Sequence, residues 1–96
     1  MRIVRHDIEI TEYQVVHLPD AGRLLSVAPS RTRAWRLDLW SLDRENPGGT
    51  WPTGVYIIGT GHPMPPELDT RPSRFLGTAV TPSGLVWHVF EGPVRP

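Results

Sequence analysis

The segment Gly59-Thr60-Gly61-His62, which is followed by Pro63, holds the residue types with the clearest potential for chemistry in this sequence. The two glycines allow backbone conformations with positive φ and let another group approach the main chain closely. Pro63 favours an extended conformation of His62. Free amides in such a loop, together with the Thr60 hydroxyl, would form an anion-binding nest. The competing interpretation is a structural corner, in which a bulge and a turn end a strand and His62 packs against it.

Hydrolytic and nucleophilic chemistry finds little support in these residues. The two glycines lack the lysine and the following helix of a phosphate-binding P-loop, so the sequence does not indicate nucleotide hydrolysis. Catalysis by Ser26, Ser41 or Thr60 with a histidine base would need an exposed, strained nucleophile and an orienting acid, and no motif indicates either. We therefore expect a protein that is not an enzyme.

Metal chemistry is disfavoured by the spacing of the four histidines, His6, His17, His62 and His88. No pair of them stands two or four residues apart, and no carboxylate stands beside two of them, so we expect no metal site. On an apolar strand face, His88 is expected to be a hydrogen-bonded core residue. The sequence has no cysteine, which excludes disulfides and zinc–thiolate sites and favours a reducing, cytoplasmic compartment. We expect no cofactor.

Arginine and tryptophan supply the candidate residues for protein contact. Trp40 shares a predicted strand face with Arg36, and Trp51 stands next to Pro52 in a predicted loop. Both residue types are over-represented at binding hot spots, so Arg36, Trp40 and Trp51 are candidate interface residues. The alternative for either tryptophan is a structural role, in which the indole plugs the end of a barrel.

The charge of the chain restricts its partners. Ten basic residues, all of them arginine, balance ten acidic ones, so the formal net charge is zero and nucleic acid is not expected as a partner. The absence of lysine is typical of a GC-rich genome, although selection for bidentate guanidinium contacts would produce the same bias. No apolar run approaches the ~18 residues of a membrane span, and no leader pattern opens the chain, so we expect neither membrane insertion nor secretion.

The elements that must position these residues are predicted to be β-strands. Eleven prolines and nine glycines interrupt the chain at short intervals, and no segment sustains a helical period of apolar residues. A chain of 96 residues suffices for one small domain. We expect a single all-β domain over residues 1–96, with about six antiparallel strands in a small sandwich or a partly open barrel. Strand patterns cover residues 2–10, 13–18, 23–28, 33–43, 55–58, 74–81 and 85–91.

Turn residues separate these strands. Residues 19–22 predict a turn, residues 46–50 a loop, and residues 65–69 at most one helical turn. Thr81-Pro82-Ser83-Gly84 fits a type I turn closed by a glycine bulge, so the last two strands are predicted to form a β-hairpin.

The apolar faces of two strands carry further expectations. In strand 33–43, Trp35, Leu37 and Leu39 share one face, which we predict to be core, and Trp87 is predicted to be core as well. In strand 85–91 both faces are largely apolar, so this strand is predicted to be interior or to form an interface. Each apolar face must be buried against another layer of the domain or against another molecule. We therefore also expect self-association into a homo-oligomer.

Five sequence blocks together resemble one protein family. Over essentially the whole chain, their ordered set resembles a family of small uncharacterised proteins encoded by tailed bacteriophages and by bacteria that carry prophages. The blocks are Leu25-Ser26-Val27, Leu39-Trp40-Ser41-Leu42, Ile58-Gly59-Thr60-Gly61-His62-Pro63, Leu76-Gly77-Thr78 and Leu85-Val86-Trp87-His88-Val89-Phe90-Glu91. The chain departs from the family mainly at residues 28–36, where its turn is longer and richer in arginine. The resemblance implies a phage-type cytoplasmic protein and no particular reaction, since the family is a domain of unknown function.

Three functions from different classes follow from these observations. The first is a non-enzymatic accessory protein that binds a host protein and modulates or sequesters it. The alternative is a binding protein for an anionic or nucleotide-derived small molecule at the Gly59–His62 segment. The third is a structural or assembly role in the virion.

Overall fold

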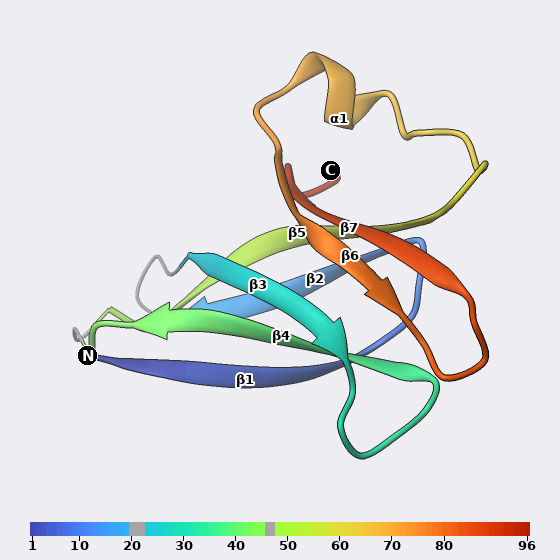
Figure 1. The fold of residues 1–96 in the computed structure, drawn as a ribbon. Coiled ribbons are helices and arrows are strands. Elements are labelled where there is room, and N and C mark those ends of the chain that lie inside the picture. Colours follow the sequence, from blue (N-terminus) through green and yellow to red (C-terminus); the bar gives the residue numbers. More distant parts are fainter. Residues whose placement is uncertain (20–22, 46–47) are drawn as a thin grey trace.

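The structure is a computed structural model that describes residues 1–19, 23–45 and 48–96. The described residues form seven strands and one short helix (Figure 1). In chain order these elements are β1 (Arg2–Glu9), β2 (Tyr13–Pro19), β3 (Leu24–Pro29), β4 (Arg36–Asp43), β5 (Thr50–Gly59), α1 (Glu67–Thr70), β6 (Arg74–Val80) and β7 (Val86–Gly92). The all-β prediction is confirmed.

The strands pair into two antiparallel sheets. Sheet A has the order β1-β4-β3, and sheet B has the order β2-β5-β7-β6. The short connection after β1 therefore leads from one sheet to the other, because β1 pairs with β4 and β2 pairs with β5 (Figure 1). Of the two architectures predicted, the described strands form the sandwich and no closed barrel.

The main core lies between the two sheets and follows the two-residue alternation of the strands. Sheet A contributes side chains such as Leu37 and Leu39, and sheet B contributes Val55 and Val89, all of them fully buried. Trp87 is half-buried and packs against this cluster, as predicted. Burial of this apolar surface is the main favourable term in the stability of such a small domain.

A second, smaller core lies on the outer face of sheet B, where α1 and its flanking segments cross the sheet (Figure 1). Leu68 of α1 packs there with Tyr56 and Ile58 of β5, and Phe90 of β7 packs against them. The predicted helical turn is confirmed, with Pro66 at the N-cap. The second apolar face of β7 is thus covered within the chain at Phe90.

The predicted hairpin between β6 and β7 is confirmed. The amide of Gly84 donates to the carbonyl of Thr81 at 2.8 Å, and the amide of Thr81 donates to the carbonyl of Leu85 at 3.0 Å. Gly84 has a φ of 86°, which is the conformation that a glycine bulge requires.

The described residues form seven strands, where about six were expected. Two bounds of the sequence prediction are wrong. Strand β5 begins at Thr50, well before the predicted residue 55, because residues 50–54 continue the pairing with β2. Strand β4 begins at Arg36, because the Ser30 hydroxyl accepts the amides of Thr32 and Arg33 and holds the preceding residues in a turn.

The late start of β4 also overturns the predicted burial of Trp35. This side chain precedes the strand and is 69% exposed, so it is not part of the core. The predicted turn at 19–22 lies largely outside the described residues, as does part of the predicted loop at 46–50.

Candidate binding surfaces

The four predicted ligand-binding residues lie together in one tight turn at the end of β5. The amide of His62 donates to the carbonyl of Gly59 at 3.0 Å, and Gly61 has a φ of 87°. A turn with positive φ at its third residue is of type II, which favours glycine at that position. The amide of His62 is therefore engaged within the turn.

Gly59 is needed for a different reason than Gly61. It is buried, and a Cβ at this position would lie 2.9 Å from Nδ1 of His62 and 3.4 Å from the Trp87 ring. The imidazole of His62 therefore lies directly on the Gly59 backbone. The close approach of a side chain, and not the backbone conformation, explains this glycine.

The Thr60 hydroxyl is also engaged within the chain. It lies 2.7 Å from Nε2 of His88, and Nδ1 of the same ring lies 3.0 Å from the Thr78 hydroxyl. His88 is half-buried on the outer face of sheet B, so it is hydrogen-bonded as predicted but stands outside the core between the sheets. In a catalytic triad, a carboxylate accepts a hydrogen bond from the second ring nitrogen of the histidine. Here the Thr78 hydroxyl lies at that nitrogen of His88 instead.

A groove of about 260 Å³ borders this turn, and its lining includes Thr60, His62, Leu85 and Trp87. An anion in this groove would have to compete with His88 for the Thr60 hydroxyl. The arrangement therefore favours the structural corner over the anion nest. His62 is exposed, as are Thr60 and Gly61.

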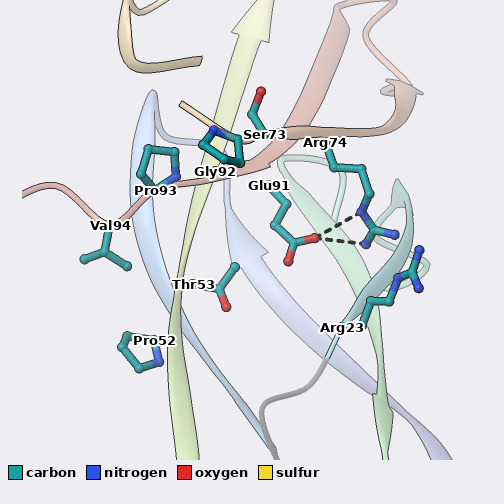
Figure 2. A pocket seen from close by; sticks show the side chains of 10 residues that line it. Arg23, Pro52, Thr53, Ser73, Arg74, Glu91, Gly92, Pro93 and Val94 are labelled. Carbon is teal, nitrogen blue, oxygen red and sulfur yellow. Dashed lines mark hydrogen bonds and ion pairs between the residues drawn. The ribbon is translucent and has the colours of Figure 1, made fainter. Parts of the chain in front are cut away.

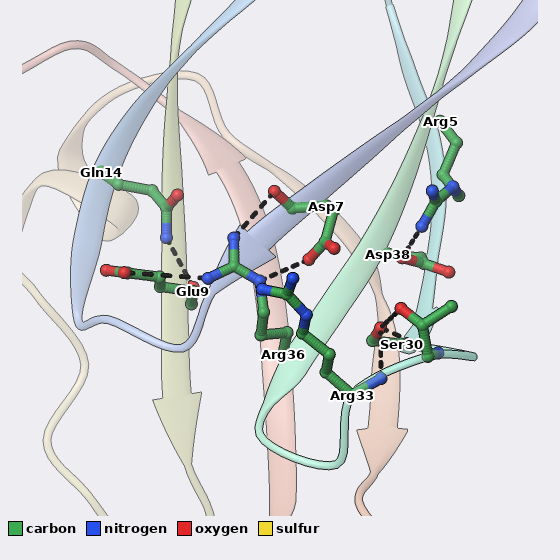
Figure 3. A network of polar contacts seen from close by, with 9 residues as sticks. Arg5, Asp7, Glu9, Gln14, Ser30, Arg33, Arg36 and Asp38 are labelled. Atoms are coloured by element: carbon green, nitrogen blue, oxygen red, sulfur yellow. Dashed lines mark hydrogen bonds and ion pairs between the residues drawn. The ribbon is translucent and has the colours of Figure 1, made fainter.

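Arg36 and Trp40 lie on the outer face of sheet A, on the central strand β4. Two residues of the neighbouring strand β1 hold Arg36 there (Figure 3). Its Nε donates to Oδ1 of Asp7 at 2.5 Å, and its Nη2 donates to the Asp7 carbonyl at 3.2 Å. Its Nη1 lies 3.7 Å from Oε1 of Glu9. The hydrogen bond from Arg36 lowers the pKa of the Asp7 carboxyl. Arg36 is thus a cation held by ion pairs on the outer face of sheet A, with a side chain that is 19% exposed.

Asp38 is a residue of this face that the sequence analysis did not single out. Its side chain is 1% exposed, and its Oδ1 accepts a hydrogen bond from Nη1 of Arg5 at 3.0 Å (Figure 3). Its Oδ2 has no hydrogen-bond partner among the described residues. The sequence alone could not predict this ion pair, because Arg5 and Asp38 are 33 residues apart in the chain. They meet only through the pairing of β1 with β4.

Trp51 does not join Arg36 and Trp40. It lies opposite Leu18 in the register of β2 and β5, and directly opposed residues of antiparallel strands point to the same side of a sheet. Since Leu18 is fully buried between the sheets, Trp51 points to that side as well, near the beginning of β5, where it is 52% exposed. The structure thus separates the three candidate interface residues into two places.

A family model described as a domain of unknown function, DUF7352, matches residues 1–96. The chain belongs to this family. Its membership of an uncharacterised family, expected from the sequence blocks, is confirmed. No curated protein and no solved structure matches the chain significantly. In the part of the DUF7352 chain that the structure describes, no helix has the length and apolar character needed to cross a membrane.

The DUF7352 domain also has a cavity that sequence reasoning missed. It measures about 540 Å³, with Arg23, Arg74 and Glu91 on one side and Pro52, Pro93 and Val94 on the other (Figure 2). Arg74 donates from Nη2 to Glu91 at 2.9 Å and also to the Leu24 carbonyl, so it links sheet B to sheet A. These residues come from distant segments, and no sequence spacing connects them.

Proposed function

We propose that this DUF7352 domain is a non-enzymatic binding module that binds a host protein, and modulates or sequesters it, through the outer face of sheet A. The observation that carries the proposal is the guanidinium of Arg36, held by Asp7, on the same face of β4 as Trp40, a sheet face that α1 leaves uncovered (Figures 1 and 3). Arg36 and Trp40 therefore stay predicted interface residues, and Trp51 is assigned to another place.

Binding through this face would cost little conformational entropy. A side chain that is already held in one conformation loses little entropy when a partner contacts it. Asp7 and Glu9 hold Arg36 in this way, and Trp40 supplies a large, rigid apolar surface four residues further along the same face of β4. Arginine and tryptophan are the residue types in which binding energy concentrates at protein interfaces.

The chemistry of this face suggests a protein partner. Arg5 and Arg36 each have a carboxylate partner in Asp38 and Asp7, and Glu9 adds a third carboxylate, so these ion pairs leave no excess of positive charge. Nucleic acid is recognised by an uncompensated positive surface, which this face does not provide. A mixed polar and aromatic protein surface fits it better.

The biological setting is also part of the proposal. The Gly59–Pro63 block and the strand Leu85–Glu91 support a phage-type or prophage-encoded protein, and the absence of cysteine supports the bacterial cytoplasm as its location. The partner would then be a protein of the bacterium that carries the gene.

The test is affinity capture from a lysate of that bacterium, with the captured protein identified by mass spectrometry. Arg36→Ala and Trp40→Ala are expected to reduce capture at least tenfold. Trp51→Ala is the matched control, because it removes a tryptophan from outside this face and is expected to leave capture unchanged. Circular dichroism must show that all three variants are folded. Undiminished capture by the folded double variant Arg36→Ala/Trp40→Ala would refute the proposal.

The small-molecule alternative keeps one specific observation in its favour, the groove of about 260 Å³ beside the exposed His62. If an anion binds there, phosphate or a nucleotide will raise the melting temperature of the native protein, and His62→Ala will abolish this shift. Native mass spectrometry distinguishes the two functions further, since a captured metabolite adds mass to the purified protein.

A further inference from the structure

Two tyrosines form an aromatic corner on the outer face of sheet B. Tyr13 of β2 and Tyr56 of β5 are directly opposed in the register, and their rings pack edge to face with centroids 5.1 Å apart and an interplanar angle of 62°. Glu67, the first residue of α1, stands beside them and lines the same cavity as Tyr56. An aromatic corner with a carboxylate at its rim is suited to a cation.

The chain places its own arginine in this corner. The guanidinium carbon of Arg95 lies 4.4 Å from the centroid of Tyr13 and 5.4 Å from that of Tyr56. Its Nε donates to Oε1 of Glu67 at 2.6 Å, and its backbone amide donates to the Tyr13 hydroxyl at 2.8 Å. The backbone amide of Glu67 itself and the Arg95 guanidinium both lower the pKa of the Glu67 carboxyl, so the site is an ionised acid facing a cation.

The segment that carries Arg95 follows the last strand, β7, which ends at Gly92. Besides the contacts of Arg95, the hydrogen bond from the Tyr56 hydroxyl to the Pro93 carbonyl at 2.6 Å attaches this segment to the sheet. Its last three residues, Val94, Arg95 and Pro96, are exposed. The Arg95–Glu67 pair is solvent-accessible, with side-chain exposures of 41% and 25%, and such pairs contribute little to stability. A cavity of about 380 Å³ next to this segment leaves room for a second chain.

We propose that Tyr13, Tyr56 and Glu67 form a binding site for an arginine side chain of a partner protein, which Arg95 occupies when that partner is absent. The partner presents this arginine in an exposed, extended segment, as the chain itself does with Val94, Arg95 and Pro96. Arginine is favoured over lysine, because a planar guanidinium stacks on the rings and donates to the carboxylate at the same time. The site lies on sheet B and is independent of the interface proposed on sheet A.

The experiment uses the full-length Arg95→Ala variant and an acetylated peptide with the sequence Gly-Pro-Val-Arg-Pro, followed by NMR titration. The variant is expected to bind the peptide, with shifts at Tyr13 and Tyr56. The unmutated protein is expected to bind it about tenfold more weakly, since Arg95 leaves only a fraction of the sites open. A peptide with lysine in place of arginine is expected to bind at least threefold more weakly. Adding Glu67→Gln to the variant should abolish binding.

Arg71→Ala is the matched control, because Arg71 lines the same cavity without a ring contact, and in the Arg95→Ala background it should not weaken peptide binding. Circular dichroism checks the fold, and Arg95→Gln replaces Arg95→Ala if the latter is unfolded. Absence of peptide binding by the folded variant at millimolar concentration, or equal affinity for the lysine peptide, would overturn the proposal. So would self-association of the unmutated protein that Arg95→Ala abolishes, since the occupant would then be a second copy.

Discussion

At the scale of single residues, Asp38 combines a charge with nearly complete burial. It lies on the outer face of sheet A, yet its side chain is 1% exposed, and Arg5 supplies its one ion pair among the described residues. A buried ion pair contributes little by itself, but removing one partner leaves the other charge uncompensated in a region of low dielectric. The same pair borders the proposed interface, so its integrity affects the shape of that face.

We predict that Arg5→Met destabilises the domain by about 3 kcal/mol, because Asp38 loses its cation. Arg2→Met is the matched control. The Arg2 side chain is 68% exposed, and Asp43, which is 11% exposed, keeps the hydrogen bond that it accepts from the Glu45 amide, so the loss of Arg2 should cost about 1 kcal/mol or less. Urea unfolding measures both values. Adding Asp38→Leu to Arg5→Met should recover much of the loss. Equal costs for Arg5→Met and Arg2→Met would contradict this prediction.

His6 gives the stability of the domain a dependence on pH. Its Nε2 lies 2.7 Å from the buried Ser41 hydroxyl, and burial lowers its pKa below the ordinary value of 6.5. The unfolded chain then binds a proton more readily than the folded one, so stability is complete above pH 6.5 and declines as the pH falls below it. The lowered pKa values of Asp7 and Asp43 act separately, below their ordinary value of 3.8.

The measurement is urea unfolding between about pH 7.5 and 5, which brackets the ordinary pKa of histidine. We expect the free energy of unfolding to decrease over this range in the unmutated protein, and His6→Gln to remove that part of the decrease. His17→Gln is the control, since His17 is exposed on β2. A pH profile that His6→Gln leaves unchanged would show that this imidazole is not its source.

At the scale of elements, the turn that ends β5 depends on two glycines in two different ways. Gly61 has a φ of 87° and open space where a Cβ would lie, whereas Gly59 has no positive φ and the imidazole of His62 lies against it. The prediction that this segment is a structural corner agrees with its internal hydrogen bonds, while anion binding there stays untested.

Gly61→Ala is predicted to destabilise the domain by about 1 kcal/mol or more, through backbone strain alone. Gly59→Ala is predicted to displace His62, so its cost should fall when His62→Ala is introduced as well. A double-mutant cycle measured by thermal or urea unfolding gives this coupling. Additive costs for Gly59→Ala and His62→Ala would mean that the imidazole does not lie on Gly59 in solution.

At the scale of the whole molecule, the segment from β5 to β6 and the C-terminal residues cover part of the outer face of sheet B. This removes part of the reason to expect self-association, since Phe90 of β7 is packed inside the chain. Apolar side chains stay exposed at the other end of the sheet, with Val80 and Leu85 55% and 56% exposed at the β6–β7 hairpin. Any homo-oligomer is therefore expected to form there.

We predict concentration-dependent association in sedimentation experiments at micromolar protein. Val80→Lys should abolish it by placing a charge on the exposed end of β6. Val15→Lys, a matched change on β2, the opposite edge strand of sheet B, should have no effect. A monomer at all concentrations would rule out the expected homo-oligomer.

The sequence by itself determined the class of fold and the local geometry of its turns. Alternating apolar residues and scattered proline and glycine specify strands, and the Thr81–Gly84 residues specify their hairpin turn, because these preferences act over a few neighbouring residues. The gathering of Gly59 to His62 in one turn was predictable for the same reason. The exposure of Trp35 was not, because the Ser30 hydroxyl delays the start of β4.

The tertiary structure alone decided which residues meet across the chain. Register places Arg5 diagonally across from Asp38 and separates Trp51 from Trp40. The path of the last residues brings Arg95 onto two tyrosines that are distant in the sequence. Strand order and register depend on how two sheets and a crossing segment pack as a whole, and no local pattern encodes that choice. Sites assembled from distant strands therefore become visible only after the whole chain has folded.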